Sequence, residues 1–498
     1  MGVVLERPVA IVFALDAVRI ADNPGLRNTK SAGCARFPAA DEASVRHAEP
    51  ALAGRRAEHF TRFAGLASGS EVPQYPHPSV KRFSSEARTL QWLDRRVGAP
   101  VCMALTLARR LGDLARGSRR AGGEGSILFL KLAEQGSTVL AHEAVRRAVA
   151  RVGRENVHFL VFEENRFVVD LLGLVPSENV FTVRTESAWA MATSAVRVLS
   201  AIRRRRFGAC IDMEFFSRFS AAIAYLTGAG TRVGFHVYFG EGPYRGDLMT
   251  HRVLYNPHLH TSRTFTSLVL ALDADPGKFP TFGAIPPESP PAPAFQPGPG
   301  ERADVERMLA ELGIPHTGRL VVLNANAGDL LPLRKWDPRN YEVLAARLIA
   351  EFPDLWIGFT GSPEEASRIE AIAGAVGSPR SVCLAGRTTL RQLLVLFGLA
   401  EVLVTNDSGP AHFAALTSID VVALFGPETP LLFSAQGPRS HSIWAGIACS
   451  PCVNAFNNRQ TACRDNVCMK SITVDQVFAT VGRIYRARTL GARAQAPA

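Results

Sequence analysis

The sequence predicts an α/β protein with two parallel sheets, each covered by helices. Apolar, β-rich runs alternate with helical segments in two blocks, a pattern typical of parallel strands covered on both faces. Seven prolines within residues 286–300 predict a stiff linker between the blocks. A ligand is expected at the carboxyl ends of the strands. The expected strands are residues 126–133, 157–164, 179–184, 207–214 and 231–237, then 319–326, 355–361, 381–386, 401–407 and 421–426.

Composition excludes several classes of protein. The chain has 498 residues, 47% of them hydrophobic and 20% charged, which suits a globular protein with sizeable cores. No apolar run approaches the roughly 20 residues of a membrane-spanning helix, so a channel or transporter is not expected. Eight cysteines do not make a secreted disulfide scaffold, and no convincing signal peptide is found. We therefore expect a cytoplasmic protein.

The positive charge is concentrated in one segment near the start of the chain. The formal net charge is +11, and residues 88–120 carry eight arginines against two aspartates. The RNP pattern of RNA-binding domains and the Cys2His2 zinc-finger pattern are missing, so no nucleic acid partner is expected. An anionic membrane surface and a phosphorylated substrate explain the charge equally well. The segment predicts a basic amphipathic helix on an anionic membrane surface. The alternative is a helix packed on its own protein with arginines facing water. Residues 1–87 predict a disordered extension.

The most informative segment is residues 402–430. A buried strand ends at Asn406 and Asp407, and the turn Ser408-Gly409-Pro410 begins a helix. Free backbone N–H groups at a helix start form an anion site, which His412 would reach. The alternative is an ordinary capped turn.

The stretch NDSGPAHFAALTSIDVVALFGPETP (406–430) resembles the signature of glycosyltransferase family 9, the bacterial heptosyltransferases of lipopolysaccharide core synthesis. SILFLKLAEQGSTVLAHEAV (126–145) and NANAGDLLPLRKWDPRNYEVLAARL (324–348) resemble other parts of that family. The resemblance covers about residues 126–480 and implies the GT-B fold, two Rossmann-like domains facing across a cleft. It implies an acceptor domain at 125–285 and a nucleotide-sugar domain at 301–485.

The resemblance also implies residue roles for the donor. Arg334, followed by Lys335, stands where the family contacts the donor phosphates, and a solvated charge pair is the alternative. Glu365, or Glu364, falls near the position that binds the donor ribose. The implied donor-binding residues are Asn326, Arg334, Lys335, Glu365, Asp407, Ser408, Gly409 and His412.

One departure from the family affects catalysis. Family members commonly have Gly-Asp in the first loop, with the aspartate as general base, whereas this chain has Gly136-Ser137. Serine alone is a poor base, so we expect Glu134 to remove the acceptor proton while Ser137 orients the hydroxyl. The alternative is that Glu134 is a surface residue and the activity differs. Fixed positive charge would stabilise the leaving diphosphate, so no metal is expected to be required for catalysis.

Two further groups carry expectations. Tyr244, Arg245 and His251 are candidates for binding an anionic acceptor. Cys449, Cys452, Cys463 and Cys468 have the spacing C-x2-C-x10-C-x4-C, which suggests a structural zinc or iron site. Some related bacterial enzymes that glycosylate autotransporter proteins resemble it in having a four-cysteine iron site. Two disulfides or reduced, packed thiols are the alternatives.

The combined expectation is an inverting glycosyltransferase that moves a sugar, which the resemblance implies to be heptose, from an ADP-linked donor. The acceptor would be a lipopolysaccharide core or related anionic glycolipid at the inner face of the cytoplasmic membrane. A protein-modifying heptosyltransferase and a catalytically lapsed nucleotide-sugar-binding protein are the alternatives.

Overall fold

The computed structural model describes residues 94, 96–116, 125–236, 244–280, 282, 286–288, 290, 292–328, 331–457 and 459–495. The expected disordered extension, residues 1–87, and both ends of the expected basic helix lie outside the described residues. All described residues belong to one unit, Pro76–Ala498.

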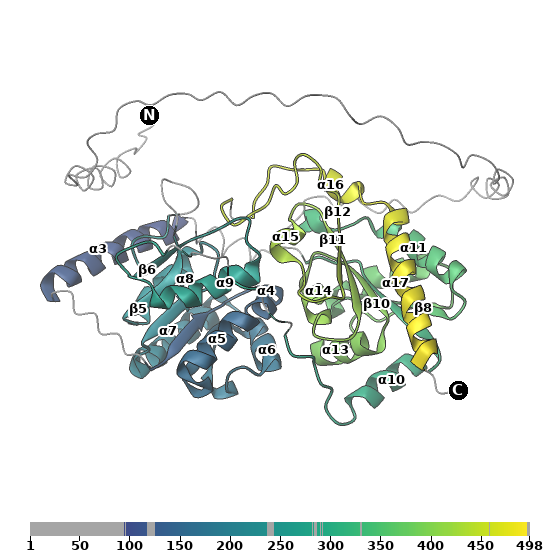
Figure 1. The fold of residues 1–498 in the computed structure, drawn as a ribbon, viewed down its shortest axis with the longest axis horizontal. Coiled ribbons are helices and arrows are strands. Elements are labelled where there is room, and N and C mark those ends of the chain that lie inside the picture. The colour runs from purple at the N-terminus through teal and green to yellow at the C-terminus, as the bar shows by residue number, and fades with distance from the viewer. Residues whose placement is uncertain are drawn as a thin grey trace, which may run out of the picture. The chain divides into compact units, whose positions relative to one another are not determined.

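The first sheet has six parallel strands in the order β3-β2-β1-β4-β5-β6. Helices flank it, as Figure 1 shows, and apolar clusters cover both faces, as expected for buried parallel strands. Leu130 pairs with Asp212, so the loops after β1 and β4 leave the sheet side by side. The strands are β1 Ile127–Leu130, β2 Val157–Phe162, β3 Val180–Val183, β4 Ala209–Asp212, β5 Thr231–His236 and β6 His251–Leu254.

The second sheet repeats this topology, with the order β12-β11-β10-β7-β8-β9 and all strands parallel. In each sheet the order switches direction beside the first strand, and ligands of such folds bind at the carboxyl ends of the strands near that switch. The strands are β7 Arg319–Asn324, β8 Leu355–Phe359, β9 Ser381–Cys383, β10 Val402–Asn406, β11 Asp420–Phe425 and β12 Ser440–Trp444.

The helices alternate with the strands, as the sequence predicts. Those around the first sheet are α4 Gln135–Leu140, α5 His142–Val152, α6 Glu163–Leu172, α7 Ala188–Arg205, α8 Arg218–Leu226 and α9 Thr261–Leu270. Those around the second are α10 Glu301–Glu311, α11 Pro338–Glu351, α12 Ala366–Ala375, α13 Leu390–Leu399, α14 Gly409–Ala414, α15 Pro430–Phe433, α16 Val467–Lys470 and α17 Val474–Gln495.

The described part of the expected basic helix is α3, Gly98–Arg116, which packs on α8. Cys102 and Thr106 are buried, and Arg109 is paired with Asp113 (2.8 Å) and with Asp247. The helix therefore packs on its own protein, as the alternative held, but Arg109 is paired and does not simply face water, and the placement on a membrane surface stays a prediction. The outer face carries a row of exposed apolar side chains at helical spacing: Met103, Leu107, Leu111 and Leu114. Among the described residues, no helix has the length and hydropathy needed to cross a bilayer.

Candidate functional site

Glu134 occupies a strained position in the loop after β1. It precedes the short helix α4 with φ 69° and ψ 80°, in the left-handed region that costs a non-glycine residue about 1–3 kcal/mol. The Ser137 hydroxyl donates to the Glu134 carboxylate (3.2 Å), so the two predicted catalytic residues lie together. The Glu134 side chain is 26% exposed, so a substrate hydroxyl can reach it. Strain of this kind is typical of functional loops.

The buried side chain of Lys131 stabilises the backbone of the loop that carries Glu134. The Lys131 side chain is fully buried, and its Nζ donates to Glu214 Oε1 (3.1 Å) and to the Ala133 carbonyl. The same Glu214 oxygen accepts from the Ala133 N–H (3.1 Å). The register of β1 and β4 brings these residues together, and their ion pair fixes the backbone immediately before Glu134.

Glu134 forms an ion pair with Arg459, which lies far along the chain. Burial opposes ionisation of Glu134, but Arg459, Lys131, the Ser137 hydrogen bond and Arg334 outweigh it and hold its pKa below its usual range. At neutral pH the carboxylate is therefore ionised, as a base must be. The sequence analysis missed Arg459, because nothing in its local pattern separates it from a surface arginine.

The loops of the two sheets meet at a pair of glycines. A Cβ on Gly136 would lie 2.6 Å from His412 Cδ2 and 3.4 Å from Gly409 Cα. A larger residue there would displace the His412 ring, so Gly136 lets the β1 and β10 loops approach closely. The predicted catalytic loop and the predicted diphosphate loop are therefore neighbours.

Arg334 lies among the residues of the signature segment. Its Nη2 donates to the Ala327 carbonyl (3.1 Å), and its Nη1 lies 3.7 Å from Asp407 and 3.9 Å from Glu428. Within the described structure, the buried Arg334 Nε and Asp407 Oδ2 have no hydrogen-bond partner. Because buried polar groups are normally paired, these atoms are suited to receive a polar ligand.

Asp407 is held in an environment that disfavours its charge. Burial is the largest cause, repulsion from Glu428 adds to it, and the pKa of Asp407 is raised well above its usual range despite Arg334. The carboxyl therefore retains its proton at pH values where an exposed aspartate is ionised. A protonated Asp407 presents a donor, not a negative charge, to a phosphate oxygen.

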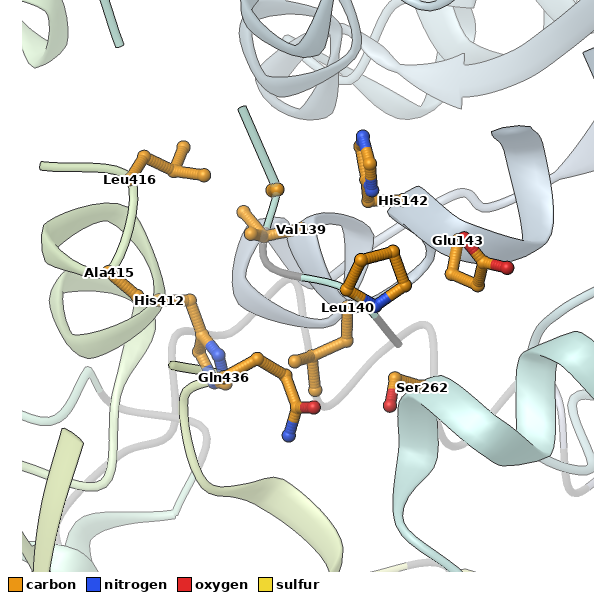
Figure 2. Close-up of a pocket in the computed structure, with 11 residues that line it drawn as sticks. Val139, Leu140, His142, Glu143, Ser262, His412, Ala415, Leu416 and Gln436 are labelled. Carbon is orange, nitrogen blue, oxygen red and sulfur yellow. The ribbon is translucent and has the colours of Figure 1, made fainter. Parts of the chain in front are cut away.

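His412 does not act as a cation. Burial, followed by repulsion from His260 and Arg334, lowers its pKa to about 4, so the ring is neutral at pH 7. His412 lines a small pocket with Leu140, His142, Ser262 and Gln436 (Figure 2). The helix it lies on, α14, has only six residues. A neutral His412, whose ring packs beside Gly136, can reach a phosphate only as a hydrogen-bonding group, and its role in donor binding stays a prediction.

The remaining donor candidates form two groups. Asn326 Nδ2 donates to Glu365 Oε2 (2.7 Å), and Arg368, which the sequence analysis did not select, donates to Asn326 Oδ1. The predicted pair is therefore together. Glu365 also closes a capping box with Ser362. The Ser408 hydroxyl donates to the Asn406 carbonyl (3.0 Å). Lys335 directly follows the short turn Pro332–Arg334, which contains Arg334.

The acceptor candidates are not brought together as a binding surface. Arg245 is buried and bound to Asp212, Ser220 Oγ (3.1 Å) and the Phe235 carbonyl (3.0 Å), so it is a structural residue of the first sheet. His251 is buried within β6 against Thr250. Tyr244 is 45% exposed and is the one of the three that a ligand can reach.

The four predicted metal ligands lie in one region. The Cys468 thiol is buried, and burial together with the nearby thiols of Cys452, Cys463 and Cys449 raises its pKa to about 11. No group of three or more His, Cys, Asp or Glu side chains in the described part of the chain is arranged to hold a metal ion. The structural zinc or iron site therefore stays a prediction.

A family comparison agrees with this geometry. The model of glycosyltransferase family 9 (heptosyltransferase) matches residues 195–462, more than half of the chain. The chain belongs to glycosyltransferase family 9. Its two parallel sheets are those of the GT-B fold.

Relatives and solved structures of this family 9 protein point the same way. Lipopolysaccharide heptosyltransferase 2 of Salmonella typhimurium is 35% identical over 101 residues, which are 20% of this chain and 29% of the relative. The structure of the E. coli ADP-heptose lipopolysaccharide heptosyltransferase II has a TM-score of 0.54 at 18% identity. It aligns over 73% of this chain and 99% of that one. The structure of a family 9 glycosyltransferase of Veillonella parvula has a TM-score of 0.58 at 14% identity. It aligns over 72% of this chain and 97% of that one.

The match to the curated relative spans under a third of its length. The structural likeness, at these identities, shows the fold. Donor and acceptor are therefore inferred from the site.

Proposed function

We propose that this protein is an inverting glycosyltransferase that moves heptose from an ADP-linked donor to a lipopolysaccharide core or related anionic glycolipid. One observation carries the proposal: Glu134 and Ser137, from the first sheet, meet the Arg334–Asp407 pair of the second sheet across the Gly136–Gly409 contact. Such a transfer requires at least a general base for the acceptor hydroxyl and a cation that stabilises the leaving diphosphate. The ADP-heptose named for the E. coli structure supports the choice of donor.

The chemistry follows from these positions. The acceptor oxygen bonds to the anomeric carbon on the face opposite the leaving group, and the bond from that carbon to the diphosphate oxygen breaks. Glu134 takes the acceptor proton, and Ser137 orients the hydroxyl. Arg334 and a protonated Asp407 stabilise the charge that develops on ADP. Since fixed positive charge supplies this term, the proposal requires no divalent cation.

A nucleotide-sugar binding panel tests the donor. We expect ADP-heptose to raise the melting temperature selectively over GDP-, UDP- and CMP-linked sugars. At about 100 times its Kd it should add roughly 2.7 kcal/mol to the free energy of unfolding. A comparable shift with another nucleotide sugar would keep the glycosyltransferase class and replace the donor. No shift with any of them would favour a lapsed enzyme.

We also propose that α3 places the enzyme on an anionic membrane surface at the cytoplasmic side. Met103, Leu107, Leu111 and Leu114 form an exposed apolar row, and the exposed Arg96 and Arg110 flank it. Leucines inserted at the headgroup level with arginines beside them are typical of interfacial helices. Each basic residue near an anionic surface contributes about 1 kcal/mol.

Vesicle sedimentation tests this placement. Leu107→Glu together with Leu111→Glu should weaken binding to vesicles containing anionic phospholipid by about a hundredfold or more, because each change removes about 1.5–3 kcal/mol of apolar burial. Val343→Glu, on a similarly exposed apolar position of α11, should leave vesicle binding unchanged. Equal binding by the double variant and the wild type would overturn the proposal.

A further inference from the structure

The segment after β12 connects the two sheets. We call residues 447–470 the strap; Figure 1 traces it in yellow between β12 and α16. Val453 and Ala455 are buried, and Ala455 belongs to the apolar core of the first sheet. Phe456 stacks on Phe216 (5.6 Å between ring centroids) and meets Tyr255 edge to face (5.3 Å). The middle of the strap is therefore anchored in the first sheet's domain.

The strap's two ends are fixed to the second sheet's domain. The N–H groups of Cys452 and Val453 donate to the Pro427 carbonyl at 3.0 and 3.1 Å. Asn466 Nδ2 donates to the carbonyls of Leu333 (3.1 Å) and Lys335 (3.0 Å), on either side of Arg334. The strap thus braces the turn that presents the predicted phosphate-binding arginine.

Arg459 lies on the return limb of the strap, among the residues of the site. Its backbone is left-handed (φ 54°), and its guanidinium lies over the Phe433 ring (5.1 Å). It pairs with Glu134, and its Nε lies 3.3 Å from Glu428 Oε1. Glu428 is also 3.9 Å from Arg334, so one buried carboxylate stands between two guanidinium groups. Arg459 therefore faces the same space as Arg334.

The carboxyl groups of this site face two guanidinium groups. Glu134 and Glu428 pair with Arg459, and Asp407 and Glu428 lie within 3.9 Å of Arg334. A diphosphate adds negative charge beside two carboxylates, and a charge-assisted hydrogen bond to an arginine is the strongest compensation available. Of the two carboxylates that pair with Arg459, Glu134 is partly exposed and Glu428 is buried, so the pair with Glu134 is the one that a ligand can reach.

We propose that Arg459 is a donor-binding residue that exchanges partners during the reaction. Without donor it holds Glu134 in an ion pair, and when a nucleoside diphosphate group binds, the guanidinium turns to the phosphates and releases Glu134 to act as base. This inference rests on the proposed function. The strap, by anchoring in both domains, delivers this second cation to the site.

Calorimetry with ADP on the full chain tests the exchange. In the Glu134→Gln background the competing carboxylate is absent, so adding Arg459→Gln should weaken ADP binding by about tenfold or more if Arg459 contacts the diphosphate. Adenosine, which lacks phosphates, should bind both variants equally. Arg464→Gln removes the same charge from an exposed position of the strap and should change ADP affinity less than twofold. Arg459→Lys should retain part of the affinity and shows that loss of folding is not the cause.

A pH profile gives a second readout. The acid limb of the kcat/KM profile reports the pKa of Glu134 in the free enzyme, where Arg459 lowers it. The acid limb of the kcat profile reports the pKa of the same group in the donor complex. The exchange predicts that the kcat limb lies at higher pH than the kcat/KM limb.

The outcomes distinguish a failure of the partner exchange from a failure of the proposed function. If the Glu134→Gln protein and the double variant bind ADP equally, or if the two limbs coincide, the exchange is wrong while the proposed function stands. If no nucleoside diphosphate binds the wild-type protein, the proposed function fails and the exchange fails with it.

Discussion

Replacing Glu134 by glutamine is expected to lower kcat by about 10²- to 10⁴-fold, the usual contribution of a general base. Glutamine keeps the size of the side chain and its acceptor oxygen for Ser137 but cannot take a proton at neutral pH. ADP should bind the variant at least as tightly as the wild type, because a negative charge beside the diphosphate has been removed. Initial rates of ADP release and calorimetry with ADP measure the two effects.

The dependence of wild-type kcat/KM on pH should follow the lowered pKa of Glu134. The pKa of Glu134 is held below its usual range in the free protein, so the base stays ionised as the pH falls toward that lowered value. We therefore expect kcat/KM to persist below the pH at which an ordinary glutamate is protonated and then to fall. Glu163→Gln, at an exposed position on α6, is the matched control and should keep the wild-type rate. A Glu134→Gln protein with wild-type kcat would show that Glu134 is not the base.

Replacing Arg334 by alanine is expected to lower kcat/KM for the donor by about 10²- to 10³-fold, as when one group that stabilises developing charge is lost. Binding of ADP alone should weaken by about 10- to 100-fold, the range for a lost charge-assisted hydrogen bond. The reason is geometric: Arg334 lies within 3.9 Å of both Asp407 and Glu428, and its removal leaves carboxyl groups facing the diphosphate.

Two further variants test whether the effect of Arg334→Ala comes from the charge, the shape and the position of this arginine. Arg334→Lys keeps the charge but not the two-pronged contact, so its defect should be intermediate. Arg339→Ala removes an exposed arginine from the first turn of α11 and should change neither constant. Unchanged ADP affinity in a folded Arg334→Ala protein would remove Arg334 from the donor site.

The sequence predicted most of the fold because buried parallel strands read as continuous apolar runs. β1, β10 and β11 are buried throughout, and each was expected. The two strands it missed, β6 and β12, are edge strands. Each begins with polar residues and ends with only two apolar ones (HRVL and SHSIW), so neither produces an apolar run.

The site was predictable only where a motif carries it. The resemblance selected Arg334, Asp407 and the Gly136 loop, whereas Arg459 comes 325 residues after Glu134 in a segment with no periodic pattern. Arg245 shows the opposite failure: sequence alone cannot distinguish an arginine that binds a ligand from one buried against Asp212. Such pairings depend on tertiary contacts that local pattern does not encode.

The most direct test of the central claim is the mass of an acceptor glycolipid after incubation with ADP-heptose, with wild-type and Glu134→Gln protein side by side. The account predicts that the wild type adds one heptose residue to the acceptor and releases an equal amount of ADP. The variant should add almost none in the same time. Release of ADP without any gain in acceptor mass, or equal transfer by the two proteins, would contradict it.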